Sequence, residues 1–227
     1  MHILVTAGPT REPIDPVRFL SNRSSGKMGY AIARAAAEGG HTVQLISGPV
    51  TLAPPRGVKI TRVETAEQML GAVRAHLGRC DVLVMAAAVA DWRPRTCSKK
   101  KLKKATTAPR LDLERTPDIL AAIRPDKGNR ILMGFAAETH AMLAEARRKL
   151  TTKGLDVIVA NDVSQADAGF EVDTNRVTLL AAGRKPEPWP LMSKDKVAKR
   201  LVRWLEARWA EKIASTTGPT RGTRQPT

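Results

Sequence analysis

Short strand-like segments recur along the chain, and helix-forming stretches separate them. The segments that predict strands are Ile3–Ala7, Thr42–Ile46, Lys59–Val63, Val82–Ala90, Arg130–Ala136 and Asp156–Ala160. The stretches that predict helices are Met28–Glu38, Ala66–Leu77, Pro117–Ile123 and Met142–Lys153. Several strand segments are apolar throughout, which indicates burial on both faces of a sheet. We therefore expect an α/β fold with a doubly wound, Rossmann-like, mostly parallel sheet.

The last third of the chain adds elements of a different kind. Val172–Ala181 and Trp189–Leu191 predict a late β-hairpin or edge strands, and Lys194–Lys212 predicts an amphipathic helix. From Ala214 onward the sequence contains Gly, Pro and Thr and shows no apolar periodicity. We expect a single domain over residues 1–213 and a disordered tail over residues 214–227.

Charge and composition narrow the class of protein. The net charge of +16 invites a nucleic-acid-binding hypothesis. Aromatic residues make up only 4% of the chain, however, so there is no stacking platform for single strands. The sequence also carries no zinc-finger or RRM signature. We therefore expect small-molecule ligands in preference to nucleic acid, and we keep a basic nucleic-acid-binding module as an alternative.

Cysteine usage and hydropathy bear on location. Cys80 and Cys97 are the two cysteines; they lack CxxC spacing, and no histidine cluster accompanies them. We therefore expect two reduced thiols rather than a disulfide framework or a zinc site. No apolar run is long enough to cross a bilayer, and the start of the chain lacks the pattern of a signal peptide. We expect a cytoplasmic protein with no membrane partner.

A loop between the first strand and the first helix is the first candidate site. Its small residues let backbone N–H groups approach an anion at a helix N-terminus, where negative charge is favoured. They are Ser24, Ser25, Gly26, Met28 and Gly29. The preceding segment is too long for a minimal βα turn, and such loops are often functional. An ordinary βα loop with a capping serine would look similar, because the spacing is neither G-x-G-x-x-G nor Walker A.

Other strand ends carry residues suited to a ligand. The alanines that follow Met85 leave room for a flat ligand, although close packing explains them equally well. Asp91 stands where ligands bind in open α/β sheets, or it caps a helix. Phe135 belongs to the core or stacks on a base, and Asn161 ends the next strand at the same edge. Their shared position predicts one site for a phosphate-rich ligand.

Basic residues gather in one segment that lacks periodicity. Residues 92–116 predict a mobile basic loop with one extended piece at Arg110–Leu113. Its Lys99–Lys104 run is cationic enough to fold over a triphosphate, although most such runs are solvated. Lys149 and Lys153 share one helix face, which is more often a solvated surface than a binding site.

The chain resembles phosphopantothenoylcysteine synthetase, the phosphopantothenate–cysteine ligase, in its bacterial, CTP-dependent form. The matching stretches occur in the family's order and cover about residues 3 to 205. They are Ala7–Phe19, Ser21–Gly29, Ala87–Pro94, Lys101–Lys104, Thr116–Leu120, Gly134–Thr139 and Ala160–Asp162. No single stretch is specific, but together they are.

The resemblance implies a role for each site residue. It assigns Lys101 to the formation of an acyl-nucleotide intermediate and Asn22 to its conversion; the extra lysines Lys99 and Lys100 blur the register. It implies a phosphate and substrate loop at Ser24, Ser25, Gly26, Met28 and Gly29. It implies nucleotide contacts at Met85, Ala86, Ala87, Asp91, Pro117, Asp118, Ile119, Leu120, Phe135, Lys149 and Lys153. Metal ligands are not identified by it.

The resemblance also implies the ligands and partners. Phosphopantothenate, cysteine and CTP would be the substrates, with Mg²⁺ as a cation that stabilises the phosphates. The family is dimeric, so we expect a homodimer, to which Val172–Leu180 could contribute a surface. In bacteria the synthetase is usually joined to a flavin-dependent decarboxylase. The expectation here is a free-standing synthetase, with a separate decarboxylase as a candidate partner.

The reaction that the resemblance implies makes chemical sense. A carboxylate does not condense with an amine at neutral pH because its leaving group is poor. Transfer to the α-phosphate of CTP gives an acyl-cytidylate and releases pyrophosphate, and the cysteine amine then releases CMP. A short-chain NAD(P) reductase is the alternative enzyme. It fits less well because Tyr30 is the only tyrosine and Arg34, not lysine, lies four residues later.

Overall fold

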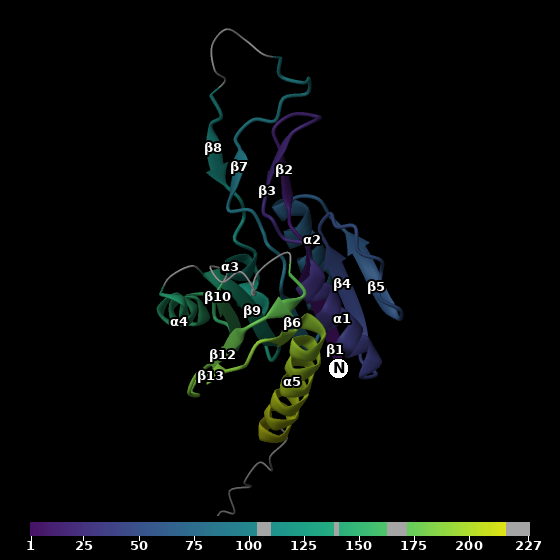
Figure 1. Ribbon diagram of the computed structural model, residues 1–227, viewed down its shortest axis with the longest axis vertical. Helices are drawn as coiled ribbons and strands as arrows, with labels where there is room; N and C mark the ends of the chain where they lie inside the picture. Colours follow the sequence, from purple (N-terminus) through teal and green to yellow (C-terminus); the bar gives the residue numbers. More distant parts are fainter. Residues whose placement is uncertain (104–109, 139–140, 163–171, 217–227) are drawn as a thin grey trace, which may run out of the picture.

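A mostly parallel, eight-stranded sheet forms the centre of the molecule (Figure 1). The computed structural model describes residues 1–103, 110–138, 141–162 and 172–216. The strand order is β13-β12-β10-β9-β6-β1-β4-β5. These strands are β1 (His2–Ala7), β4 (Thr42–Ser47), β5 (Val58–Arg62), β6 (Val82–Met85), β9 (Ile131–Glu138), β10 (Val157–Asp162), β12 (Val177–Ala181) and β13 (Glu187–Pro188). The six strands from β5 to β10 run parallel, and β12 and β13 complete one edge antiparallel.

Helices cover both faces of this sheet, which confirms the doubly wound, Rossmann-like prediction. The helices are α1 (Lys27–Glu38), α2 (Ala66–Leu77), α3 (Ile119–Ile123), α4 (Met142–Thr152) and α5 (Lys194–Thr216), and a 3₁₀ turn (Arg124–Asp126) follows α3. α1 and α5 lie on one face, whereas α2, α3 and α4 lie on the other. α5 reaches Thr216, beyond the predicted end at Lys212, and residues 217–227 of the predicted tail lie outside the described residues.

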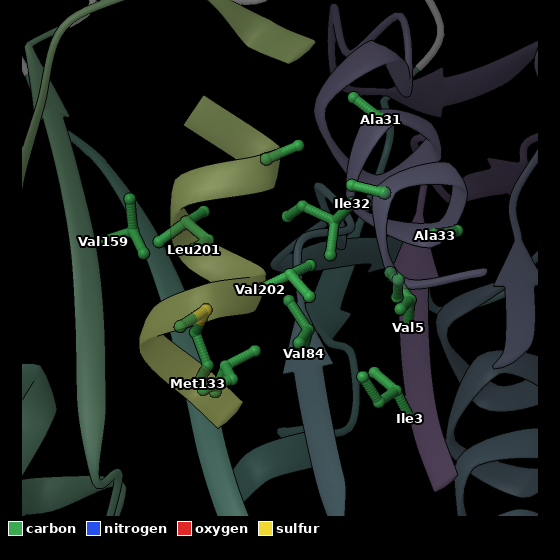
Figure 2. Close-up of a cluster of buried hydrophobic side chains, with 14 of the residues drawn as sticks. Ile3, Val5, Ala31, Ile32, Ala33, Val84, Met133, Val159, Leu201 and Val202 are labelled. Carbon is green, nitrogen blue, oxygen red and sulfur yellow. The ribbon is translucent and has the colours of Figure 1, made fainter. Parts of the chain in front are cut away.

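The core is built from strand side chains that alternate between the two faces. Figure 2 shows Val84 and Met133 on neighbouring strands facing Leu201 and Val202 of α5. Leu4 of β1 points to the opposite face and belongs to the cluster under α2. Burial of each such aliphatic side chain contributes about 1.5–3 kcal/mol, so the strand order is fixed mainly by burial.

The strand order creates a switch point between β1 and β6. From β1 the chain moves outward through β4 and β5, then returns to β6 on the other side of β1 and continues to β9 and β10. Loops that leave the carboxyl ends of β1 and β6 therefore separate to opposite faces of the sheet. In open α/β sheets this crevice is where ligands bind.

Two hairpins project beyond the sheet, and we call them the arm (residues 11–21 and 92–115, as far as the structure describes them). The arm strands are β2 (Arg11–Pro13), β3 (Phe19–Ser21), β7 (Trp92–Pro94) and β8 (Leu113–Arg115). Each hairpin is antiparallel, and β2 lies next to β7. Figure 1 shows them side by side, away from the C-terminal end of α5.

The arm differs from the sequence-based expectation. We predicted an extended piece at Arg110–Leu113, but the strand is Leu113–Arg115 and pairs with Trp92–Pro94. Local periodicity cannot reveal this pairing, because the two strands are about twenty residues apart in the sequence and only three residues long. Residues 104–109, which include Lys104, lie outside the described residues.

The predicted late strands are present, and β12 lies between β10 and β13. Val177, Leu179 and Leu180 are buried within this chain's own core. A second, two-stranded sheet joins β11 (Thr174–Asn175) to β14 (Met192–Ser193), which begins the turn into α5.

Candidate functional site

A cleft of about 700 Å³ opens at the carboxyl ends of β1, β6, β9 and β10. It lies at the switch point that the strand order predicts. Lys101 is the only predicted site residue that does not line it. The predicted residues that do are Asn22, Ser24, Ser25, Gly26, Met28, Gly29, Met85, Ala86, Ala87, Asp91, Pro117, Asp118, Ile119, Leu120, Phe135, Lys149 and Lys153.

The N-terminus of α1 forms one wall of the cleft. Gly26 is its N-cap with φ of 77°, and no side chain caps the helix. That left-handed conformation favours glycine. A Cβ on Gly29 would lie 2.5 Å from the Cβ of Ala7, so the helix can approach β1 only because this residue is glycine. No acidic residue occupies the first turn. The N–H groups of the first turn, which no side chain caps, and the helix dipole therefore favour an anion here.

Asn22 connects this wall to the segment that follows β6. Its Nδ2 donates to the carbonyl oxygens of Ala88 (3.2 Å) and Val89 (3.1 Å). Thr10 also contacts this segment: its backbone N–H donates to the Ala88 oxygen, and its Oγ1 accepts from the N–H of Ala90. The N–H groups of the Asn22 amide are thus engaged, and its Oδ1 is the side-chain atom left for a ligand.

The opposite wall comes from α3 and α4. Asp118 is the N-cap of α3, and its Oδ1 accepts from the N–H of Ala121 at 3.1 Å. Its other oxygen contacts the ammonium of Lys153, which follows α4. Lys149 lies one helical turn before Lys153 on the same side. This ion pair joins α3 to the residue that follows α4, two elements that are far apart in the sequence.

Two buried polar side chains from the last third of the chain also line the cleft. Asn175 in β11 is 3% exposed, and Lys194, the first residue of α5, is 6% exposed. The Lys194 ammonium donates to the carbonyl oxygen of Val172. Burial, together with the charge of Lys27, lowers the pKa of Lys194 to about 8, and Asp173 opposes the shift. Lys27 also lines the cleft, and its ammonium pairs with Asp173 at 2.7 Å.

Lys101 lies on the arm, and its side chain is exposed. A buried carboxylate, Asp15, holds this part of the arm. It accepts from the backbone N–H groups of Val17 and Arg18 (2.9 Å each), from that of Leu102 (3.1 Å) and from the Arg18 guanidinium. The Arg18 guanidinium and these N–H groups outweigh burial and hold the pKa of Asp15 well below its usual range.

Negative groups that could meet a cation are few. Asp91 lines the cleft, and its exposed carboxylate has no side-chain partner among the described residues. Within those residues no group of three or more His, Cys, Asp and Glu side chains could enclose a metal. One carboxylate suits Mg²⁺ that arrives on a nucleotide, because that ion keeps waters and phosphate oxygens as its other ligands.

Sequence reasoning missed Asn175 and Lys194. They come from the late strands and the start of α5, more than 140 residues after the α1 loop, so local pattern could not place them in the cleft. One signal was available. A lysine at the first position of a helix opposes the helix dipole and therefore invites a functional explanation.

Within the described residues, no helix is long and apolar enough to span a bilayer.

Comparison with known proteins gives a consistent result. The family model described as DNA/pantothenate metabolism flavoprotein C-terminal domain matches residues 1–208. The chain is 46% identical over 207 residues to the Coenzyme A biosynthesis bifunctional protein CoaBC of Bacillus subtilis (strain 168). The match covers 91% of this chain and 51% of that protein, so the chain spans about half the length of the curated relative.

Solved structures agree with the fold. The C-terminal domain of a Coenzyme A biosynthesis bifunctional protein CoaBC superimposes with a TM-score of 0.80 and 41% identity. It covers 92% of this chain, and this chain covers 96% of it. A Cab2 mutant in complex with phosphopantothenate-cysteine has a TM-score of 0.78, with 95% and 88% coverage. At 16% identity the latter likeness shows the fold alone.

Proposed function

We propose that this chain, which belongs to the family of DNA/pantothenate metabolism flavoprotein C-terminal domains, is a phosphopantothenate–cysteine ligase. One observation carries the proposal. Apart from Lys101, the residues assigned to the nucleotide, to the phosphates and to the acyl intermediate come from five separate stretches of sequence and line a single cleft at the switch point. A surface lysine pair or a packed alanine run would have no reason to meet there.

The first step of the proposed reaction forms the acyl-cytidylate. The carboxylate of phosphopantothenate attacks the α-phosphate of CTP, and pyrophosphate leaves. The uncapped N–H groups of α1 and the small residues Ser24, Ser25 and Gly26 are suited to hold the phosphates. Asp91 would hold Mg²⁺, which supplies charge neutralisation on the phosphates when bound. Lys101 would add positive charge as the arm closes over the cleft.

The second step joins the acyl group to cysteine. The amine nitrogen forms a bond to the acyl carbon, the bond to the phosphate oxygen breaks, and CMP leaves. Asn22 is assigned to this step. Because its N–H groups are used by Ala88 and Val89, its Oδ1 is the atom that can accept a hydrogen bond from the amine.

We further propose a homodimer that forms through the arm. Large apolar side chains are exposed on both hairpins, including Val17 (58%), Trp92 (48%) and Phe19 (44%). A concentration of exposed apolar groups on one feature is typical of an interaction surface. A second copy of the chain is the partner that the family resemblance favours. A separate decarboxylase would be a further partner, and a cytoplasmic location suits both.

A three-substrate assay tests the proposed function. Purified protein with phosphopantothenate, cysteine and CTP should yield phosphopantothenoylcysteine, CMP and pyrophosphate, detected by mass spectrometry. Omission of any one substrate is the control, and ATP in place of CTP tests the choice of nucleotide. Thermal-shift titrations with CTP, NADPH and duplex DNA separate the alternatives: stabilisation by NADPH or DNA, but not CTP, would favour a reductase or a nucleic-acid-binding module.

A further inference from the structure

One buried hydrogen-bond acceptor in the cleft has no donor among the described residues. The Oδ1 of Asn175 is the one buried side-chain nitrogen or oxygen atom without a hydrogen-bond partner in the described part of the chain. Leaving a buried acceptor unpaired is unfavourable, so such a group in a native cleft calls for a donor from a ligand or water. Asn175 lines the cleft, so a ligand can reach it.

A buried lysine follows the strand that pairs with Asn175: β11 pairs with β14, and Lys194 comes directly after β14. Lys194 lines the same cleft and is almost fully buried, and its backbone N–H donates to the Asp173 carbonyl oxygen at 2.9 Å. The Asp173 carboxylate pairs with Lys27, and its charge also acts on Lys194. A buried ammonium that lines the cleft, here that of Lys194, favours an anionic group on the ligand.

A cation together with an unmet acceptor selects among the substrates. A polyphosphate and the phosphate of phosphopantothenate bring many acceptors and no strong donor. An α-amino acid brings a carboxylate for the lysine and an ammonium that can donate to the Asn175 oxygen. Of the three substrates of the proposed ligase, only cysteine carries both groups, and it carries them on the same carbon atom.

We propose that Lys194 and Asn175 form the subsite for the amino-acid substrate, with Lys194 on its carboxylate and Asn175 Oδ1 on its ammonium. The inference rests on the proposed function. In the step it serves, the cysteine ammonium loses two protons, the nitrogen forms an amide bond with the acyl carbon, and CMP leaves with both electrons of the broken carbon–oxygen bond. The charges balance, and no further reactant is needed.

Cysteamine, which is cysteine without its carboxylate, gives a direct test. The wild type should use cysteine far better than cysteamine. Lys194→Met should lower kcat/KM for cysteine about 10- to 100-fold, the loss expected when a hydrogen bond to a charged group is removed. The same variant should keep kcat/KM for cysteamine within about twofold of the wild-type value, so the preference for cysteine is lost. Lys196→Met, on the exposed side of the same helix, is the matched control and should change neither value.

The two half-reactions separate this subsite from a phosphate site. Pyrophosphate release measured without cysteine should be unchanged in Lys194→Met and Asn175→Ala, and Asn175→Ala should raise KM for cysteine. If pyrophosphate release falls while the ratio of cysteine to cysteamine stays constant, Lys194 holds phosphates and the inference is overturned. An active enzyme in which neither variant alters the ratio or the cysteine KM overturns it too. A wild type that releases no pyrophosphate overturns the proposed function instead, and the subsite with it.

Discussion

The sheet with its cleft and the arm are held in place by different physical means. The central strands of the sheet are buried on both faces and pack against helices on each side, so the shape of the sheet is determined by apolar burial. The arm strands are three residues long, and apolar side chains of the arm are exposed; the buried carboxylate of Asp15 accepts from backbone N–H groups in the loops beside these strands. The sheet is therefore complete within one chain, whereas the arm has apolar surface left to cover.

This difference predicts how each region responds to change. Substitutions at the cleft should affect individual chemical steps without changing the assembly. Substitutions on the arm should affect closure or association while the sheet stays intact. The following experiments break or sharpen that contrast, beginning with the largest expected effect.

Lys101→Gln should abolish pyrophosphate release. Ordering the arm over a ligand costs about 1 kcal/mol of backbone entropy per residue, and a lysine near the phosphates in a water-poor site can offset that cost. Lys99→Gln and Lys100→Gln are matched controls on the same segment and should do little. Pyrophosphate assays on the three variants decide which lysine occupies the family's functional position. If Lys100→Gln is the inactive variant, the match to the family is shifted by one residue. If all three variants are active, these lysines are only a solvated surface.

Asn22→Asp should still form the acyl-cytidylate but should convert it to product at least about 100-fold more slowly. A carboxylate cannot donate to the carbonyl oxygens of Ala88 and Val89, so the aspartate would be repelled from its place in the cleft. Mass spectrometry of the variant with all substrates should detect trapped intermediate. Unimpaired turnover would remove Asn22 from the mechanism.

Val17→Glu should weaken the homodimer about tenfold or more, because a charge would replace the most exposed large apolar side chain of the arm. Ile213→Glu is the matched control, since Ile213 is 44% exposed near the end of α5, away from the arm. Light scattering over a range of micromolar concentrations measures both variants. A wild-type chain that is only a 24.7 kDa monomer would refute the dimer itself.

Lys194→Met should raise the melting temperature at pH 7. The folded protein holds the pKa of Lys194 near 8, below its ordinary 10.5, so the unfolded chain binds the proton more tightly. Below pH 8 the buried charge costs stability; that cost shrinks as the pH rises from 8 to 10.5. The gain should be roughly 2–4 °C per kcal/mol for a domain of this size. A gain that did not shrink in that window would contradict the assigned cause.

The sheet was easier to predict from the sequence than the arm, because the sheet is determined by apolar burial and the arm by a few specific contacts. The apolar runs at Val82–Met85 and Val157–Ala160 must be buried wherever they lie, so composition alone indicates strands. The hairpins depend on the pairing of Trp92 with Arg115 and on Asp15 reaching Leu102, and neither contact has a periodic signal. Likewise, the cleft residues next to the early strands were predictable from the parallel topology.

Asn175 and Lys194 mark the limit of that reasoning. Their place in the cleft depends on β11, β14 and the start of α5 folding back over the carboxyl edge of the sheet. Nothing within a few residues of either position indicates a ligand, apart from a lysine at an unfavourable helix position. Only the assembled structure brings them next to Lys27.

The central claim is that one cleft activates a carboxylate with a nucleotide before cysteine takes part. The most direct measurement is pyrophosphate release from CTP, with and without phosphopantothenate, in the complete absence of cysteine. The account predicts release only when phosphopantothenate is present, at no more than one equivalent per active site until cysteine is added. Release that ignores phosphopantothenate, or no release until cysteine is present, would contradict it.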